Sequence, residues 1–349
     1  MSTALYRTHR PQTFADLMGQ EHITNILEKA AKDGSISHAY LFSGSRGTGK
    51  TSTARILARL IGTLPDDLYE LDGASNNGVD EVRELREQVR VLPFSSPQKV
   101  YIIDEVHMLS KAAFNALLKT LEEPPAHVVF MLATTEPHKL PDTVVSRCQH
   151  FHFKRPTEDI LARHVEKIAK KEGYSIEAEA SALIAMLGDG SYRDTLTVLQ
   201  QVLSSVEGKE TTHEHVVRVT GAPSQELVRN VVLGLVDGNL DLALASVTEA
   251  SRSHLDIKVF TKLIMRELRH AMLIVLSPTI RAKLEVELSP GSLAFLRLVG
   301  EKGKGRPILV NSLRELLIAY DQISLAAVAH LPLELALVGT IGDQEEKHR

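Results

Sequence analysis

The sequence predicts an α/β domain built on an open parallel sheet, followed by two all-helical regions. Three observations support this prediction. Short apolar runs alternate with helical patterns up to residue 155, a glycine-rich octet follows the first of these runs, and only helical patterns follow residue 155. Parallel strands that are covered on both faces read as short continuous apolar runs, and a β-then-α rhythm is typical of doubly wound sheets.

Five runs are predicted to be the strands, because each is short and apolar at its centre. They are Ala39–Phe42, Leu68–Leu71, Val100–Ile103, Val128–Ala133 and His150–Phe153. Helical spacing predicts helices between most of them, at Thr51–Ile61, Val79–Val89 and Lys111–Leu121. Ligands of such sheets bind at the carboxyl ends of the strands. We therefore expect the functional residues to follow the strands.

Two breaks divide the chain into three predicted domains, at residues 1–155, 156–220 and 221–349. At the first break, Pro156 disfavours continuation and Thr157 is a good helix N-cap. The second break is the segment Gly221-Ala222-Pro223-Ser224. The middle domain is predicted to be small and all-α. The third is rich in Leu, Val and Ala, so its helices either form a self-contained core or also supply an oligomer contact.

Composition excludes several classes of protein. The 349-residue chain is 43% hydrophobic and 24% charged, which is ordinary for a soluble globular protein. It has no apolar run near the ~18 residues that span a bilayer and no apolar signal-peptide core, so we expect a cytoplasmic protein without a membrane partner. Cys148 is the only cysteine, which excludes an intrachain disulfide and a cysteine-rich zinc site. Because the formal net charge is −4, any contact with nucleic acid requires a local basic surface.

The glycine-rich octet matches G-x-x-x-x-G-K-[ST], the phosphate-binding P-loop. It reads Gly44-Ser45-Arg46-Gly47-Thr48-Gly49-Lys50-Thr51, and Ser52 continues into the predicted helix. Its glycines permit backbone conformations that a Cβ would forbid, and its N–H groups and the helix N-terminus are expected to face a phosphate. Lys50 is predicted to contact the β- and γ-phosphates and the Thr51 hydroxyl to hold Mg²⁺.

Two acids, Asp104 and Glu105, follow the third predicted strand. Asp104 is expected to share a magnesium ion with Thr51, and Glu105 to polarise a water as a general base. A solvated turn would present the same two acids, and their pattern alone does not separate the two interpretations. The intact P-loop favours the catalytic one.

Two arginines are candidates for stabilising the transferring phosphoryl group, a role that contributes about 10³–10⁵ in rate. Arg147 precedes the last predicted strand, and Arg193 begins a helix of the middle domain. Spacing alone favours ordinary surface ion pairs for both, which contribute little to stability.

Together these motifs resemble those of AAA+ ATPases and, among them, the γ/τ subunits of bacterial DNA polymerase III clamp loaders. The resemblance covers roughly the first 200 residues, whereas the last third is similar only in helical character and position. The residues that carry it are Tyr6–His22, His38–Gly44, Asp104–Ser110, Phe114–Pro125, Ala133–Pro137 and Ser146–Cys148.

The resemblance implies roles that spacing does not give. It implies that Arg147 is an arginine finger acting in trans on ATP held by a neighbouring subunit, that Thr135 is a first sensor near the γ-phosphate, and that Arg193 is a second sensor. Residues that line the adenine pocket in such proteins correspond to Arg7, Arg10 and Pro11. The three predicted domains would then be an AAA+ P-loop NTPase domain, a helical lid, and a collar for oligomerisation.

The implied function is that of an ATP-hydrolysing motor subunit, within the DNA-directed DNA polymerase holoenzyme, that opens a sliding clamp and loads it onto primed DNA. The implied partners are δ- and δ′-type subunits, other copies of this chain, the clamp, and primer–template DNA contacted at its phosphates without sequence specificity. The implied cofactors are ATP and Mg²⁺.

One departure and two alternatives accompany this interpretation. Many γ/τ subunits carry a four-cysteine zinc module after the P-loop helix; here residues 62–67 bridge that gap, so no zinc is expected. One alternative is an AAA+ branch-migration or helicase motor, against which His107–Ser110 and Ser146–Cys148 argue. The other is a non-hydrolysing clamp-loader scaffold, against which the intact Gly49-Lys50-Thr51 argues.

Overall fold

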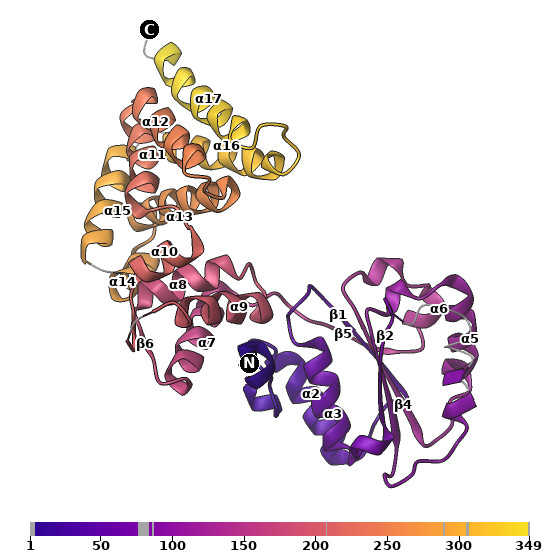
Figure 1. Ribbon diagram of the computed structural model, residues 1–349. Helices are drawn as coiled ribbons and strands as arrows, with labels where there is room; N and C mark the ends of the chain where they lie inside the picture. The colour runs from indigo at the N-terminus through magenta and orange to yellow at the C-terminus, as the bar shows by residue number, and fades with distance from the viewer. Residues whose placement is uncertain are drawn as a thin grey trace. The chain divides into compact units, whose positions relative to one another are not determined.

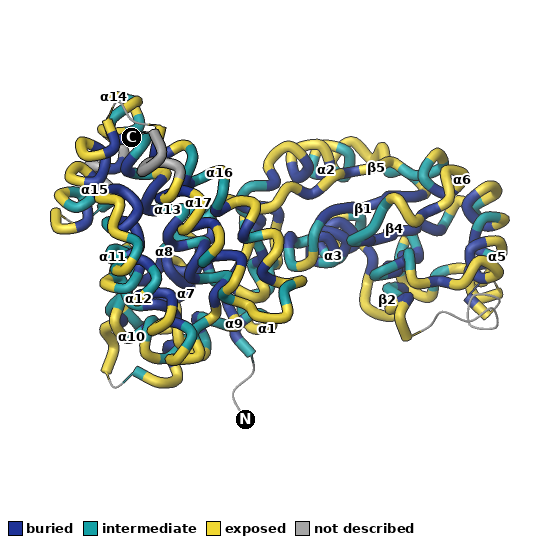
Figure 2. The backbone as a smooth tube through the Cα atoms, turned by 90° about the horizontal axis from the view of Figure 1, so that it is seen from above, coloured by how far each residue is buried: buried dark blue, intermediate teal, exposed yellow. Residues whose placement is uncertain are grey.

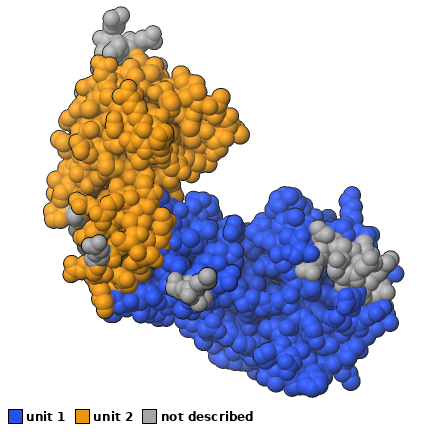
Figure 3. Space-filling model, viewed as in Figure 1, with its two compact units in different colours: residues 1–173, 184–200 blue, residues 174–183, 201–349 orange. Residues whose placement is uncertain are grey.

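The computed structural model describes residues 4–75, 84–85, 87–206, 208–288, 290–304 and 307–347. They form two compact units, one of Met1–Gly173 with Ile184–Gln200 and one of Tyr174–Leu183 with Gln201–Arg349 (Figure 3). The predicted middle domain is thus shared between the units, and the three-domain division stays a prediction. Much of the predicted helix Val79–Val89 lies outside the described residues; residues 84, 85 and 87–89 are helical.

The first unit is built on a five-stranded parallel sheet (Figure 1). Its strand order is β2-β3-β4-β1-β5. The predicted parallel sheet is therefore confirmed, and all five predicted runs form strands. β5 begins and ends one residue before its predicted bounds. The strands are β1 (Ala39–Ser43), β2 (Leu68–Asp72), β3 (Lys99–Asp104), β4 (Val128–Thr134) and β5 (Gln149–His152).

Helices cover both faces of this sheet, because successive side chains of a strand point to opposite sides. Tyr40 and Phe42 of β1 lie in one apolar core with α2 (Glu21–Asp33) and α3 (Lys50–Leu60). Leu41 lies in the other, with α5 (Lys111–Glu122) and α6 (Asp142–Val145). β1 and β4 are buried throughout and β3 nearly so, as Figure 2 shows for the centre of the sheet. The expectation that every strand is covered on both faces is wrong for β2 and β5, which are edge strands and are partly exposed.

The region after residue 155 is mostly helical. The helix α7 (Glu158–Lys171) begins as predicted, with the Thr157 hydroxyl accepting the Ile160 N–H. It is followed by α8 (Ala178–Leu187), α9 (Tyr192–Leu203) and α10 (His213–Thr220). The prediction of helices alone is wrong here, since β6 (Ser175–Ile176) pairs in parallel with β7 (Glu210–Thr211). Strands of two residues are too short to show a periodic pattern.

The rest of the second unit consists of packed helices, several of which begin or end at a glycine or proline of the sequence. Gly238 has a positive φ and follows α11, while Pro278 and Pro290 are the first residues of α14 and α15. No described helix combines the length and apolar character needed to span a membrane. The helices are α11 (Gln225–Asp237), α12 (Leu240–Arg252), α13 (Ile257–Leu276), α14 (Pro278–Glu287), α15 (Pro290–Gly303), α16 (Ile308–Ile323) and α17 (Leu331–Lys347).

A buried carboxylate stabilises the loop before β3. The Asp67 side chain is fully buried and accepts backbone N–H bonds from Phe94, Ser95 and Ser96 at 2.6, 2.9 and 2.8 Å. Burial raises the pKa of this carboxyl, but the hydrogen bonds outweigh it and lower the pKa to about 2. Asp67 therefore contributes stability that is present above the ordinary carboxyl pKa and is lost as the pH falls toward about 2.

We expect Asp67→Asn to lower the free energy of unfolding by about 1–3 kcal/mol at pH 7, because an amide offers one acceptor oxygen to three donors. Urea unfolding followed by circular dichroism measures this loss, and the difference from wild type should narrow as the pH falls below about 4. The exposed neighbour Asp66 provides the matched control, Asp66→Asn. Equal stability of the two variants at pH 7 would contradict the assignment.

Candidate functional site

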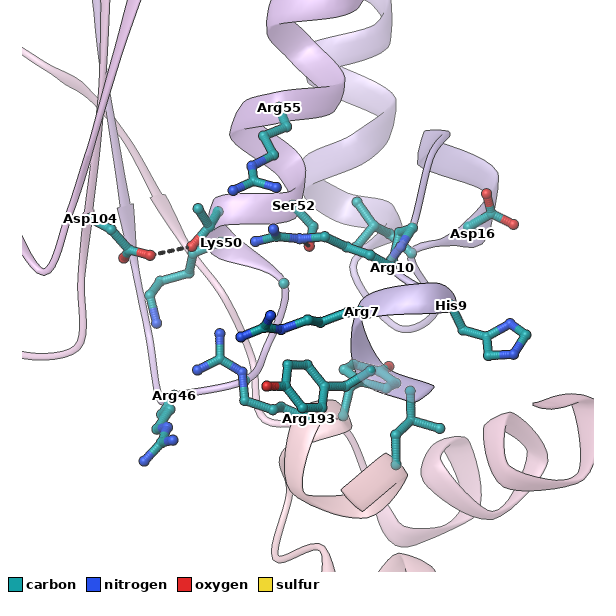
Figure 4. Close-up of a pocket in the computed structure, with 18 of the residues that line it drawn as sticks. Arg7, His9, Arg10, Asp16, Arg46, Lys50, Ser52, Arg55, Asp104 and Arg193 are labelled. Carbon is teal, nitrogen blue, oxygen red and sulfur yellow. Dashed lines mark hydrogen bonds between the residues drawn. The ribbon is translucent and has the colours of Figure 1, made fainter. Parts of the chain in front are cut away.

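A pocket of ≈ 890 Å³ lies in the first unit, where β2 and β3 end beside the P-loop (Figure 4). Segments far apart in the sequence contribute to it, namely the N-terminal segment, the P-loop, the two strand ends, α7 and α9. Basic and acidic side chains both line it. They are Arg7, Arg10, Arg46, Lys50, Arg55 and Arg193 on the basic side and Asp16, Glu70, Asp72, Asp104 and Glu105 on the acidic side.

The P-loop has the backbone that its glycines predict. Gly44, Gly47 and Gly49 all have positive φ, and Gly49 is the N-cap of α3. A Cβ on Gly47 would lie 2.0 Å from the Ser191 hydroxyl, so only glycine fits there. The Gly47 carbonyl also accepts the Tyr192 N–H at 3.0 Å. The loop is thus fixed against the start of α9.

The Lys50 ammonium is buried inside this loop. The residue is 5% exposed, and its Nζ donates to the carbonyls of Gly44 and Ser45 at 2.8 and 2.9 Å. Burial lowers the pKa of Lys50, while the nearby carboxylates of Glu105 and Asp104 oppose that shift. Among the described residues Lys50 forms no salt bridge. A buried cation of this kind is suited to an anionic ligand.

The Thr51 hydroxyl donates to Asp104 Oδ2 at 2.7 Å (Figure 4). The two residues come from the first turn of α3 and the last position of β3, so the fold brings together the pair expected to share Mg²⁺. Hydroxyl and carboxylate oxygens are ligands that Mg²⁺ prefers. This donor set therefore fits the predicted ion.

Glu105 lines the pocket and is bonded to the neighbouring strand end. Its Oε2 accepts the Thr135 N–H at 3.2 Å and the Thr135 hydroxyl at 2.9 Å. Thr135 follows β4, which pairs with β3, as expected for a residue beside the acid strand. Thr135 does not itself line the pocket and is connected to it through Glu105.

The N-terminal segment and α9 supply three arginines to the pocket. Phe14 and Leu17 are buried in the core with α2 and α3, which holds the preceding residues over the P-loop helix. Arg10 donates from Nε to the Ser52 hydroxyl at 3.3 Å. Arg193, in the first turn of α9, lies over the Tyr6 ring at 5.7 Å from its centroid. Figure 4 shows Arg7, Arg10 and Arg193 extending into the same space beside Lys50.

Arg147 is not brought into this pocket. Its Nη2 lies 2.8 Å from Glu122 Oε1, and its Nη1 donates to the Thr143 carbonyl at 2.7 Å. Within the single chain it forms the surface ion pair that spacing alone favoured.

Most of the predicted ligand-binding residues line the pocket. Gly44, Ser45 and Thr48 do not line the pocket. They contribute to the internal structure of the loop; the Thr48 hydroxyl, for example, donates to the Ser45 carbonyl at 2.8 Å. The predicted residues that do line it are Arg7, Arg10, Pro11, Arg46, Gly47, Gly49, Lys50, Thr51 and Ser52.

Sequence reasoning missed several lining residues. Asp72 ends β2 as Asp104 ends β3, and the two are partners in the strand register, so its position after a predicted strand was a usable signal. His164 lies on the apolar face of α7, where burial lowers its pKa to about 4 and keeps it neutral. Arg55 and Glu70 form an ion pair across α3 and β2 that no sequence pattern indicated.

No cluster of three or more His, Cys, Asp or Glu that could hold a metal occurs among the residues that the structure describes. His150 and His152 both lie close to the Ser43 hydroxyl, at 2.7 and 3.2 Å, and form a small polar contact between β5 and β1.

Three family models match parts of the chain. One described as DNA polymerase III, delta subunit, matches residues 62–157. A second, DNA polymerase III clamp loader subunit, ATPase lid domain, matches residues 160–208. The third, magnesium chelatase, subunit ChlI, matches residues 13–103.

Curated proteins of several bacteria are similar to the chain over most of its length. DNA polymerase III subunit tau of Bacillus subtilis is 46% identical over 268 residues, which is 70% of this chain and 47% of that protein. The protein of the same name from Escherichia coli is 39% identical over 295 residues, 78% of this chain and 46% of that protein. The chain thus spans about half the length of the curated relatives it matches.

Among solved structures, the Holliday junction branch migration motor RuvB of Thermotoga maritima is similar, with a TM-score of 0.54. The match covers 71% of this chain and 86% of that one at 20% sequence identity, so it shows a shared fold alone.

Proposed function

We propose that this chain, which belongs to the tau/gamma family of bacterial DNA polymerase III subunits, is an ATP-hydrolysing motor subunit of a clamp loader. Its fold is that of AAA+ proteins, a P-loop on a five-stranded parallel sheet followed by a helical lid. The observation that carries the proposal is the Thr51–Asp104 hydrogen bond beside the buried Lys50, because it brings the groups proposed to bind Mg²⁺ and phosphate close together.

In the proposed mechanism, Lys50 and the P-loop bind the phosphates of ATP, and Thr51 and Asp104 hold Mg²⁺. The ion would neutralise part of the phosphate charge. Glu105, which lines the pocket, orients a water and accepts its proton. Arg193 contributes positive charge from the start of α9, and Arg7, Arg10 and Pro11, which line the same pocket, would lie beside the adenine.

Arg147 completes the mechanism from a second copy. Because it lies outside its own pocket, ATP bound at a junction between subunits would draw Arg147 of one copy toward the phosphates held by the next. The ion pair with Glu122 is partly exposed, and such pairs contribute only about 0.2–1 kcal/mol, so releasing Arg147 costs little. ATP binding would thereby assemble subunits, and hydrolysis would separate them.

The proposed partners follow from this role. They are δ- and δ′-type clamp-loader subunits, further copies of this chain, a sliding clamp, and primer–template DNA bound through its phosphates. We propose that this activity belongs to the DNA polymerase holoenzyme, which the names of the relatives support, and that the protein acts in the cytoplasm.

The decisive experiment is the ATPase rate of the assembled loader with and without primed DNA and clamp. We expect DNA and clamp together to raise the rate, because they complete the sites between subunits. Stimulation by branched DNA alone would favour a branch-migration motor. Failure of the purified chain to bind ATP with Mg²⁺ would favour a non-hydrolysing scaffold subunit.

A further inference from the structure

His107 lies between two carboxylates at the end of β4. Its side chain is 6% exposed. The ring Nδ1 lies 3.0 Å from Thr134 Oγ1 and 3.4 Å from Glu105 Oε2, and Nε2 lies 3.1 Å from Glu136 Oε2. Both ring nitrogens therefore have polar partners, which fixes the orientation of a buried imidazole.

A strained backbone turn places His107 there. Glu105 has φ 45° and ψ 46°, a left-handed conformation that is unfavourable for a residue other than glycine. The 3₁₀ turn η3 (Val106–Met108) follows, closed by the Met108 N–H donating to the Glu105 carbonyl at 2.9 Å. This turn directs the chain back across the end of β4. The left-handed backbone at Glu105 therefore helps to set the positions of both the Glu105 and the His107 side chains.

Only one oxygen of the Glu105 carboxylate is engaged. Oε2 accepts both hydrogen bonds from Thr135 and faces His107, while Oε1 has no hydrogen-bond partner among the described residues. A carboxylate anchored through one oxygen can direct the other into the pocket that it lines. The orientation of Glu105 therefore depends on the groups that hold Oε2.

Glu136 is a fixed partner for the other side of the ring. Its Oε2 accepts from Lys139 Nζ at 2.7 Å, and its backbone N–H donates to Thr134 Oγ1 at 3.0 Å. The hydrogen bond from Lys139 lowers the pKa of Glu136, so this carboxyl stays ionised at neutral pH. Thr134 Oγ1 and Glu105 Oε2 are both acceptors for a hydrogen on His107 Nδ1, and Glu136 Oε2 is the acceptor for a hydrogen on Nε2. The side chains of Glu105, His107, Thr134 and Glu136 form one contiguous bridge. The bridge ends at Lys139 in the 3₁₀ turn η4 (Pro137–Lys139).

We propose that His107 is a positioning residue for hydrolysis, which holds the Glu105 carboxylate in the orientation that activates water by linking it to Thr134 and Glu136. This role rests on the proposed ATPase function. Neither His107 nor Glu136 lines the pocket, so the bridge acts on the chemical step and leaves nucleotide binding unaffected.

Three substitutions of His107, made in the full chain, test the role. We expect His107→Ala to lower kcat by about 10²-fold, the typical cost of a small misplacement of a reacting group, while the Kd for ATP stays within about twofold. The side-chain amide of asparagine reaches the position of Nδ1 in the histidine ring. The amide of the longer glutamine side chain reaches the position of Nε2. His107→Asn should therefore recover more activity than His107→Gln, since it keeps the contact with Glu105.

His138→Gln is the matched control, because the His138 side chain is 75% exposed and its Nε2 comes no closer than 4.0 Å to Glu136 Oε1. It should keep the wild-type kcat. An unchanged kcat in His107→Ala would overturn the role. So would a loss of kcat that follows a loss of Tm equally in all three His107 variants, because that pattern indicates a purely structural residue.

A spectroscopic measurement separates the bridge from the ATPase itself. The ring ¹⁵N resonances of His107 are identified by their loss in His107→Gln. We expect the Nδ1 resonance to shift in Glu105→Gln and the Nε2 resonance to shift in Glu136→Gln, without any nucleotide present. An Nδ1 resonance unmoved in Glu105→Gln would overturn the bridge, whereas absent hydrolysis with both shifts observed would overturn the proposed function instead.

Discussion

Lys50→Ala is expected to abolish ATP binding. The ammonium is the buried cation of the P-loop, held by the Gly44 and Ser45 carbonyls in a position where phosphate oxygens can replace them. Hydrogen bonds between charged groups contribute about 1.5–3 kcal/mol each. Two such bonds correspond to a loss in affinity of about 10²-fold or more. Isothermal titration with ATP and Mg²⁺ measures the change directly.

The control for this variant is Lys32→Ala, in a residue whose side chain is 72% exposed and whose one ion pair among the described residues is with Glu28. It should bind ATP as the wild type does. Because Lys50 is buried, thermal unfolding of Lys50→Ala must be recorded beside the titration, and Lys50→Met preserves more of the side-chain volume. A folded Lys50→Met that kept wild-type affinity would refute the P-loop assignment.

Arg147→Ala is expected to leave ATP binding nearly intact and to slow hydrolysis by about 10³–10⁵-fold, the contribution of a positioned arginine to phosphoryl transfer. The structure supports this separation, because Arg147 does not line the pocket of its own chain. ATPase rates and ATP affinities of the assembled protein measure the two quantities. Glu122→Gln is the matched control: it removes the ion pair of Arg147 and keeps the arginine, so hydrolysis should not slow.

Mixing Arg147→Ala with Lys50→Ala tests whether the arginine acts between copies. Each variant is expected to be inactive on its own. In a mixed assembly, the intact P-loop of one variant can meet the intact arginine of the other, so activity should return at some of the junctions. If no ratio of the two restores hydrolysis, the proposed action of Arg147 on a neighbouring subunit fails.

The strands of the sheet were predictable from the sequence because burial on both faces leaves a continuous apolar run. That reasoning worked for the central strands β1, β3 and β4. It overestimated the burial of the edge strands, which depends on how many neighbours a strand has. The pairing of Ser175–Ile176 with Glu210–Thr211 was missed, since it joins residues far apart in the chain and has no local pattern.

The candidate site was predictable where its chemistry is local. A P-loop is a contiguous segment, and Asp104 is the last residue of a strand, so the positions of Lys50, Thr51 and Asp104 could be inferred one by one. The position of Asp72 could have been inferred in the same way. The ion pair of Arg55 with Glu70 and the bridge through His107 join separate elements, and nothing within either partner's segment indicates the other.

The sequence by itself determined the five strands of the main sheet, the phosphate loop and the residue types available for catalysis, because hydrophobic periodicity and glycine requirements are properties of short segments. Only the tertiary structure decided which of these residues meet. It brought Thr51 to within 2.7 Å of Asp104, joined Glu105 to Thr135 and His107, and left Arg147 outside its own pocket. The reason is that such contacts depend on strand order and on turns such as the strained one at Glu105, which bring distant segments together.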